Sequence, residues 1–483
     1  MRSHLFVRGY KSITFKGLYD QVAAPPKSVL DVNGWIKSIR LMKNVAFMDL
    51  QDGTTSNLLK VVVPIGRNDG QDSASFLKKL KTGQSISIKS ALWQNTPERK
   101  QPFELKVENP LETISIVGEV SETYPLQKKY QSLPFLRTLP TLKHRTTYLG
   151  SLLRFRSEFE YSLTNFFRSQ AFIKVSPPVL TSGDCEGAGE LFKVESNSFL
   201  GKGDKSSYFG RPTYLTVSTQ LHLEILALAL SRCWSLSPCF RAEESDTNRH
   251  LSEFWMLETE LCYTKNVHEL TELVKNMLRA GIKSSFTHFS ELIPETVPEN
   301  STPKEQLLQR WNMLLDSNSW KTITYTKAIE LLEERHGKVP FSHYKPQWGE
   351  ALQTEHEKWL AGEYFKSPVF VTDYPKECKA FYMKVNSDNK TVACFDLLVP
   401  EMGEIVGGSL REDNLELLQQ EMQARGMNKN GDLDWYVSLR KDGTVPHGGF
   451  GLGLERILSY LYGNSNIRDA IPFHRAASGT IDL

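Results

Sequence analysis

The sequence is short of cysteine and has no long apolar run. Its six cysteines are scattered over 483 residues and none forms a Cys-x-x-Cys pair, which excludes a zinc knuckle. Such sparse thiols are typical of proteins in a reducing compartment. No stretch reaches the roughly 18 uninterrupted apolar residues of a transmembrane helix, so the sequence predicts no membrane partner.

Acidic residues are absent from the first eighteen positions. Arg2, Arg8, Lys11 and Lys16 lie there among serines and apolar residues. This composition predicts a mitochondrial transit peptide over residues 1–22, and therefore a protein of the mitochondrial matrix. A basic arm that contacts RNA is the alternative interpretation.

Net charge is only +2, but basic residues gather at the front of the chain. Residues 1–120 hold 17 Lys and Arg against 11 Asp and Glu, whereas the remainder holds 41 against 45. A basic front end suggests a polyanion partner held by the N-terminal part. A solvated lysine-rich surface would give the same count.

Short, partly alternating apolar runs fill residues 27–118 and are separated by Gly, Asn and Asp. They lie at 29–36, 47–53, 58–63 and 85–92. This pattern predicts a small antiparallel β-barrel, and an OB-fold fits its size and basic charge. OB-folds hold single-stranded nucleic acid with stacking aromatics and a positive groove. Candidate contacts are Trp35, Arg40, Phe47 and Gln51.

The rest of the chain alternates helical and strand-like patterns. Prolines punctuate residues 119–147, which predicts a linker. Residues 148–483 are predicted to form a second domain, with a charged, leucine-rich helical insertion at about 266–360. The predicted fold class is α+β, an N-terminal barrel followed by a mixed helical and strand domain.

The segment from Phe240 to Phe254 is predicted to form a hairpin with a charged tip. Arg241 lies on an apolar strand, where a guanidinium suits bidentate hydrogen bonds to a phosphate. Glu243 falls on the same strand face and could accept an exocyclic amine, and Phe254 could stack on a base. An ion-pair network on an exposed hairpin is the alternative.

Two further clusters carry candidate chemistry. Four glycines between His447 and Glu455 open an apolar helix with Arg456 in its first turn. The cluster lacks the Gly-Lys-Ser/Thr of a P-loop, and tight packing is its alternative explanation. Asp396 and Glu404, separated by one loop, could share Mg²⁺ or could be surface acids.

Together these segments resemble the motifs of the class II aminoacyl-tRNA synthetases, most closely those of the asparaginyl-tRNA synthetases. Residues 240–258 are similar to motif 2, residues 449–457 to motif 3, and Pro178 to the proline of motif 1. Residues 184–192 resemble a loop that covers the amino acid, and 466–473 resemble the C-terminal segment. The resemblance implies an OB-fold anticodon-binding domain, an antiparallel catalytic sheet and a homodimer.

The resemblance also implies roles in ATP binding. Arg241 would hold the α-phosphate and Arg456 the γ-phosphate, both as catalytic residues. The remaining ATP contacts would be Glu243 and Phe254 at the adenine, and Arg249 and His250 near the triphosphate and the tRNA end. Asp396 and Glu404 would hold Mg²⁺, with Glu404 also among the ATP contacts.

Recognition of the amino acid follows in the same way. Glu186, Ser218 and Gln220 would contact its α-amino and carboxylate groups, and Arg411 its side-chain carbonyl. Aspartyl enzymes carry a lysine where this chain has Leu223, and an unpaired buried carboxylate is costly. The implied reaction is therefore ATP-dependent ligation of L-asparagine to tRNA(Asn) for mitochondrial translation.

Other functions stay open at this point. An aspartyl enzyme or a relaxed enzyme that charges both amino acids is one alternative. A non-catalytic RNA-binding relative is another, although it should have lost Arg241, Arg456 or one of the paired acids, all of which are present. A relative that makes free asparagine should lack the barrel.

Overall fold

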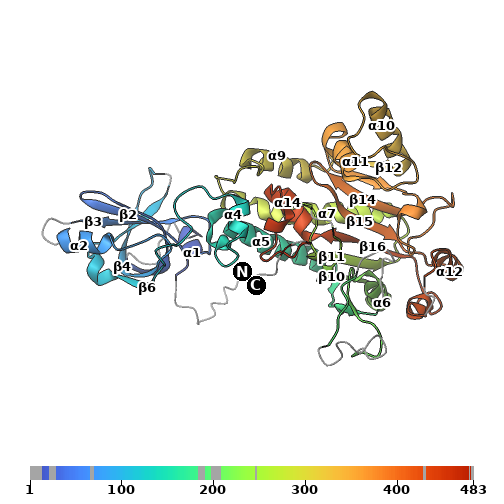
Figure 1. The fold of residues 1–483 in the computed structure, drawn as a ribbon, viewed down its shortest axis with the longest axis horizontal. Helices are drawn as coiled ribbons and strands as arrows, with labels where there is room; N and C mark the ends of the chain where they lie inside the picture. Colours follow the sequence, from blue (N-terminus) through green and yellow to red (C-terminus); the bar gives the residue numbers. More distant parts are fainter. Residues whose placement is uncertain are drawn as a thin grey trace. The chain divides into compact units, whose positions relative to one another are not determined.

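The computed structural model describes residues 13–20, 29–65, 70–99, 101–182, 191–196, 208–244, 247–427, 431–477 and 479. The chain forms two compact units (Figure 1). The barrel unit comprises Met1–Arg154 with Phe289–Glu299. The sheet unit comprises Phe155–His288 with Asn300–Leu483.

The barrel unit is built on a closed, mainly antiparallel sheet. Its strand order is β1-β2-β3-β5-β4-β6, and β1 also pairs with β4, which closes the barrel. The strands are β1 (Val29–Leu41), β2 (Val45–Gln51), β3 (Leu59–Pro64), β4 (Ser85–Asn95), β5 (Phe103–Lys106) and β6 (Ile114–Gly118). Alternate residues of β1 and β2 are buried, the pattern of strands with one face on a core. The predicted N-terminal barrel is thereby confirmed.

A short helix, α1 (Phe15–Asp20), belongs to the barrel core. Phe15 and Leu18 are both 0% exposed and pack among the barrel's apolar residues. The Phe15 N–H donates to Asp52 Oδ2 at 2.7 Å, and Lys16 Nζ lies 3.3 Å from Glu291 Oε2. Residues 13–20, which fall inside the leader predicted over 1–22, are thus part of the barrel in this structure, and the leader stays a prediction. Basic residues spaced among apolar ones suit a leader and equally suit a helix with one buried face.

We expect Phe15→Ala to lower the free energy of unfolding of the barrel unit by about 3–5 kcal/mol, because the ring would leave a cavity in a packed core. Urea unfolding of the full chain, followed by a barrel probe such as Trp93 fluorescence, measures the change. Lys16→Ala, on the exposed side of the same helix, should shift stability by less than about 0.5 kcal/mol. Equal, small effects of both variants would show that α1 does not stabilise the barrel.

The sheet unit contains an eight-stranded sheet with the order β12-β13-β14-β15-β16-β11-β10-β7. Neighbouring strands pair antiparallel except at the two edges, where β12–β13 and β10–β7 are parallel. The strands are β7 (Ile173–Lys174), β10 (Arg232–Phe240), β11 (Glu253–Cys262), β12 (Lys321–Thr324), β13 (Val369–Thr372), β14 (Cys394–Val399), β15 (Gly403–Leu410) and β16 (His447–Gly453). The predicted hairpin is β10–β11, and the predicted α+β class is confirmed.

Helices cover the sheet. α6 (Gln220–Leu230) packs on β10 and β11, and α14 (Leu454–Tyr462) packs on β11 and β16. α7 (Val267–Phe286) crosses β14, β15 and β16 (Figure 1). The part of α5 (Thr147–Ser169) that lies in this unit meets α7 closely: a Cβ on Gly281 would lie 2.7 Å from the Phe159 ring.

The helical insertion predicted at about 266–360 also needs a correction. α7 lies directly on the central sheet, and β12 forms one edge of that sheet. α7 has one row of buried residues and one charged face. An amphipathic helix of this kind has the same sequence pattern whether it packs on a sheet or belongs to a separate helical segment.

The remaining elements are shorter. In the barrel unit they are α2 (Gly70–Leu77), α3 (Pro110–Thr113), α8 (Phe289–Leu292) and α4 (Leu133–Arg137), the last within the predicted linker. In the sheet unit they are α9 (Lys304–Leu315), α10 (Tyr325–Lys338), α11 (Thr354–Lys358), α12 (Leu415–Ala424), α13 (Asp434–Ser438), and the paired strands β8 (Leu180–Thr181) and β9 (Tyr214–Leu215). Within the described ranges, no helix combines the length and apolarity needed to cross a membrane.

Candidate active site

Four neighbouring strands of the sheet place two acids and two glycines in one row. Glu258 of β11 pairs with Gly451 of β16, which pairs with Gly407 of β15. Gly407 pairs in turn with Asp396 of β14. Because paired residues on neighbouring strands share a face, the row has a carboxylate at each end and bare backbone between them.

The glycine-rich segment forms this bare floor as a strand. The sequence predicted that its glycines open a helix, but residues 447–453 are β16 and the helix begins only at Leu454. Glycine has low strand propensity, so the pattern gave no sign of a strand. Gly451 and Gly453 line a cavity, and a Cβ on Gly453 would have Arg456 as its nearest neighbour, at 3.7 Å.

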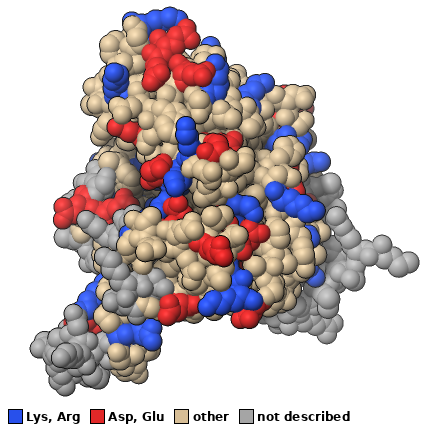
Figure 2. All heavy atoms as spheres, turned by 90° about the vertical axis from the view of Figure 1, so that its right-hand side faces the viewer, with Lys and Arg blue, Asp and Glu red and all other residues tan. Residues whose placement is uncertain are grey.

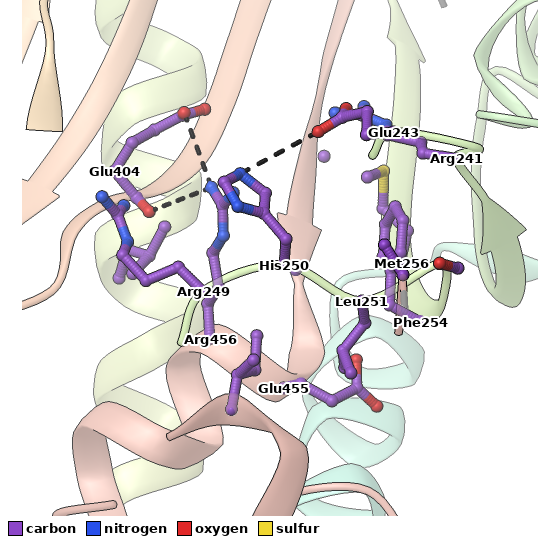
Figure 3. Close-up of a pocket in the computed structure, with 16 residues that line it drawn as sticks. Arg241, Glu243, Arg249, His250, Leu251, Phe254, Met256, Glu404, Glu455 and Arg456 are labelled. Carbon is purple, nitrogen blue, oxygen red and sulfur yellow. Dashed lines mark hydrogen bonds and ion pairs between the residues drawn. The ribbon is translucent and has the colours of Figure 1, made fainter. Parts of the chain in front are cut away.

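That cavity, about 160 Å³ and here named the hairpin cavity, collects the whole predicted ATP set. Figure 3 shows these side chains converging from the β10–β11 connection, β15 and the start of α14. They are Arg241, Glu243, Arg249, His250, Phe254, Glu404 and Arg456.

Three arginines line the hairpin cavity together with three glutamates. Arg241 lies over the Phe254 ring at 5.6 Å, Arg456 Nη1 lies 3.6 Å from Glu404 Oε2, and Arg249 Nη2 lies 3.7 Å from Glu357 Oε2. Burial and the neighbouring Arg456 lower the pKa of Arg249, a sign of crowded positive charge. Figure 2 shows the face on the right-hand side of Figure 1, where the visible acidic and basic side chains of described residues are likewise interspersed. The three guanidinium groups of the cavity could each donate to the oxygens of a polyphosphate.

Glu357 is part of this electrostatic setting, although the sequence gave no reason to select it. Its carboxylate accepts the Glu404 N–H at 3.1 Å. Burial and the neighbouring Glu404 raise the pKa of Glu357 to about 7, while Arg249 opposes the rise. Only the fold identifies Glu357, because α11 packs against β15 although the two elements lie far apart along the chain.

Asp396 and Glu404, the predicted metal pair, converge over Gly407. The point that a Gly407 Cβ would occupy lies 3.4 Å from Asp396 Oδ1 and 3.3 Å from Glu404 Oε1. Lys379 Nζ donates to the other Asp396 oxygen at 2.6 Å. In the part of the chain that is described, no group of three or more His, Cys, Asp or Glu is placed to hold a metal. Two carboxylates suit Mg²⁺, which takes its other ligands from water and phosphate.

A second cavity of about 190 Å³, the sheet cavity, adjoins the first. It contains three of the five predicted amino-acid contacts, namely Ser218, Gln220 and Arg411. The two cavities share Arg241, Met256, Glu404 and Gly451 in their linings. Side chains that the sequence did not select also line the sheet cavity: Glu258, Lys379 and Tyr382.

The other two predicted amino-acid contacts are not in this cavity. Glu186 lies outside the described residues. Leu223 is 0% exposed and packs with Ala227 and Cys233. Its part in recognition of the amino acid stays a prediction.

Arg411 is held by a buried carboxylate. Its Nη2 lies 2.9 Å from Glu260 Oε2, and its Nη1 donates to Ser409 Oγ at 2.8 Å. The side chains of Arg411 and Glu260 are 3% and 0% exposed. Burial raises the pKa of Glu260, and the Arg411 guanidinium opposes that rise. The ion pair fixes the guanidinium at the sheet cavity.

A second buried carboxylate, Glu224, supports Gln220 one helical turn away. Gln220 Nε2 donates to Glu224 Oε1 at 3.2 Å. The other partners of the Glu224 carboxylate are Tyr436 OH at 2.9 Å, Arg440 Nη2 at 2.8 Å and His447 Nε2 at 3.0 Å. Although burial acts to raise it, Arg440 and His447 hold the pKa of Glu224 below its usual range. The only feature of the sequence that could have pointed to Glu224 is its place as the single acid in the mostly apolar run 221–230.

The four candidate nucleic-acid contacts lie on the outer face of β1 and β2. Trp35 pairs with Gln51, and Arg40 pairs with Phe47, so each pair shares a face. Arg40 lies over the Phe47 ring at 5.7 Å, and Trp35 is 40% exposed. Gln51 Nε2 donates to the Arg145 carbonyl at 3.1 Å, so its amide already has a partner in the barrel unit.

Comparisons with known proteins agree with this geometry. The family model "tRNA synthetases class II (D, K and N)" matches residues 135–477, and "OB-fold nucleic acid binding domain" matches 31–111, which confirms the predicted OB-fold. The mitochondrial asparagine–tRNA ligase of Saccharomyces cerevisiae is 59% identical and is aligned over 99% of this chain and 98% of its own. The asparagine–tRNA ligase of Borreliella burgdorferi is 42% identical and is aligned over 93% of this chain and 95% of its own. The structure of the asparaginyl-tRNA synthetase of Pyrococcus horikoshii, solved with asparaginyl-adenylate, matches with a TM-score of 0.81. The two chains are 26% identical, and the match covers 98% of this chain and 100% of the other.

Proposed function

Because the chain belongs to the class II aminoacyl-tRNA synthetases, and among them to the asparagine–tRNA ligases, we propose that it ligates L-asparagine to tRNA(Asn) through an asparaginyl-adenylate. The observation that carries the proposal is the shared wall of the two cavities. Arg241 and Glu404 line both, so an amino acid in the sheet cavity would lie beside a nucleotide in the hairpin cavity.

The reaction needs positioning and charge neutralisation more than covalent chemistry. In the proposal the asparagine carboxylate attacks the α-phosphorus of ATP in line, and pyrophosphate leaves. Arg241 stabilises the charge that develops on the α-phosphate, and Phe254 stacks on the adenine. Glu243 accepts the adenine amine. Arg456, with Arg249 and His250, holds the β- and γ-phosphates.

Asparagine itself would bind in the sheet cavity. Gln220, held by Glu224, would receive the α-amino group together with Ser218, and Glu186 is proposed for the same group by resemblance. Arg411 would donate to the side-chain carbonyl. The Arg411–Glu260 pair suits an amide, since one guanidinium edge is already neutralised by a carboxylate.

We propose Mg²⁺ as the cofactor beside ATP, held by Asp396 and Glu404. When bound there, it would neutralise phosphate charge and orient the triphosphate. The bare Gly407 backbone between the two carboxylates leaves room for the ion and its water. Lys379 holds Asp396 in place through the other oxygen of that carboxylate.

The barrel, the partner copy and the compartment complete the proposal. Trp35, Arg40, Phe47 and Gln51 are proposed as anticodon contacts. A homodimer is proposed from the motif 1 resemblance at Pro178. The mitochondrial matrix is proposed as the location, with residues 1–22 as the transit peptide.

Aminoacylation of mitochondrial tRNA with ATP and either asparagine or aspartate tests the function. We expect charging with asparagine and at least about 100-fold weaker charging with aspartate, in keeping with enzymes that recognise a substrate by hydrogen bonds. Charging with aspartate alone would reject the assignment of asparagine. Comparable charging with both would indicate a relaxed enzyme, and no charging with either would reject the synthetase function.

A further inference from the structure

A third cavity, larger than the other two at about 590 Å³, lies beyond the hairpin cavity and is here named the rear cavity. All of its lining residues belong to the sheet unit. They come from residues 247–250, 300–310, 354–358, 401–402 and 459–467. The predicted ATP and amino-acid contacts leave most of this wall without a role.

The three cavities are arranged in series. The sheet cavity shares four lining residues with the hairpin cavity, and the hairpin cavity shares Arg249, His250 and Ile467 with the rear cavity. Of the described residues, none lines both the sheet cavity and the rear cavity. A molecule in the hairpin cavity therefore has the amino acid on one side and the rear cavity on the other.

Positive charge continues from the hairpin cavity into the rear cavity. Arg249 stands at the junction, and Arg310 and Lys358 lie farther along. Glu401 is the one acid in the described lining; it pairs with Arg310 at 2.6 Å and its side chain is 67% exposed. Partial burial and the nearby Arg249 lower the pKa of Lys358, and both side chains line the rear cavity.

Hydroxyl groups of the wall residues differ in what they contact. Ser459 is 0% and Tyr460 2% exposed, and neither side-chain oxygen has a hydrogen-bond partner among the described residues. Both oxygens are inaccessible, so these hydroxyls support the wall from behind and do not face its open space. Thr354, which also lines this wall, accepts from Arg249 Nη1 at 2.6 Å and ties the junction arginine to α11.

We propose that the rear cavity receives and retains the pyrophosphate released when the adenylate forms. The inference rests on the proposed function. When the asparagine carboxylate forms its bond to the α-phosphorus, the bond to the bridging oxygen breaks, and pyrophosphate leaves with that oxygen and its electron pair. An in-line displacement expels the leaving group away from the attacking carboxylate. The serial order of the cavities places the rear cavity in that direction, and Arg249, Lys358 and Arg310 meet the anion there.

Lys358 offers the cleanest test, because it lines the rear cavity and is not among the residues of the buried core, so its replacement should not disturb the fold. In ATP–pyrophosphate exchange by the full-length enzyme, we expect Lys358→Ala to raise the KM for pyrophosphate about five-fold to ten-fold, and Lys358→Glu to raise it further. The KM for ATP should rise less than the KM for pyrophosphate in both variants. Lys338→Ala, which removes an exposed lysine of α10 away from the three cavities, is the matched control and should leave both constants unchanged.

Equilibrium binding of radiolabelled pyrophosphate to the enzyme without ATP keeps this test separate from the proposed function. Weaker binding by both Lys358 variants supports the rear cavity even if the natural amino acid is not asparagine. Unchanged pyrophosphate binding and KM in Lys358→Glu would overturn the proposal. A rise in the KM for tRNA with no change for pyrophosphate would also overturn it, and would assign the cavity to the tRNA backbone.

Discussion

Replacing Arg241 by alanine is expected to lower ATP–pyrophosphate exchange by about 10²–10³-fold, the usual cost of removing one preorganised group from a developing charge. Arg241 lines both the hairpin cavity and the sheet cavity, at the point where a carboxylate and an α-phosphate would meet. Its ring contact with Phe254 fixes the guanidinium near the proposed adenine position. The loss should appear mainly in kcat, because the charge is greatest in the transition state.

Two measurements separate this catalytic effect from a structural one. Thermal unfolding of Arg241→Ala should stay within a few degrees of the parent protein, since Arg241 is only partly buried. Arg241→Lys keeps the charge but loses the bidentate fork, so its exchange activity should lie between those of the parent and the alanine variant. Near-normal exchange by the alanine variant would reject the α-phosphate role.

Replacing Arg411 by alanine is expected to destabilise the sheet unit by about 3–5 kcal/mol and to abolish activation of asparagine. The stability loss follows because Glu260, fully buried, would keep no cationic partner. The activity loss follows because Arg411 is the proposed donor to the side-chain carbonyl. Unfolding by urea and exchange at saturating asparagine measure the two effects separately.

The double variant Arg411→Met with Glu260→Gln tells the two effects apart. Removing both charges should recover most of the stability, since neither group is left as an unpaired buried ion. Exchange activity should stay at least about 100-fold below the parent, because the donor to the substrate is still missing. Recovery of activity together with stability would mean that Arg411 only supports the fold.

Most of the ATP set could be predicted because five of its seven residues lie between positions 241 and 254. Arg241 and Phe254 face each other across one hairpin, a relation that alternating strand residues define without knowledge of the fold. Placing Arg456 next to Glu404 depends on the long-range pairing of β15 with β16. Only the family resemblance indicated that the two residues belong to one site. The strand nature of β16 was missed because four glycines carry no strand pattern.

The amino-acid cavity was harder to predict, because the acids that support its lining have no distinctive pattern in the sequence. Gln220, for example, is held by Glu224, four residues later on the same helix. Glu224, Glu258 and Glu260 looked like ordinary acids in sequence. Their importance comes from burial against Arg440, Ser218 and Arg411, partners that are distant along the chain.

The bare floor formed by β16 also bears on how this enzyme could evolve resistance to an inhibitor. Adenosine analogues that lie on Gly451 and Gly453 would touch backbone that ATP is proposed to need as well. A side chain introduced at Gly451 or Gly453 to exclude such an inhibitor would point into the same cavity and exclude ATP with it. Resistance mutations should therefore arise at more exposed lining positions, for example Ala477, and not on the floor.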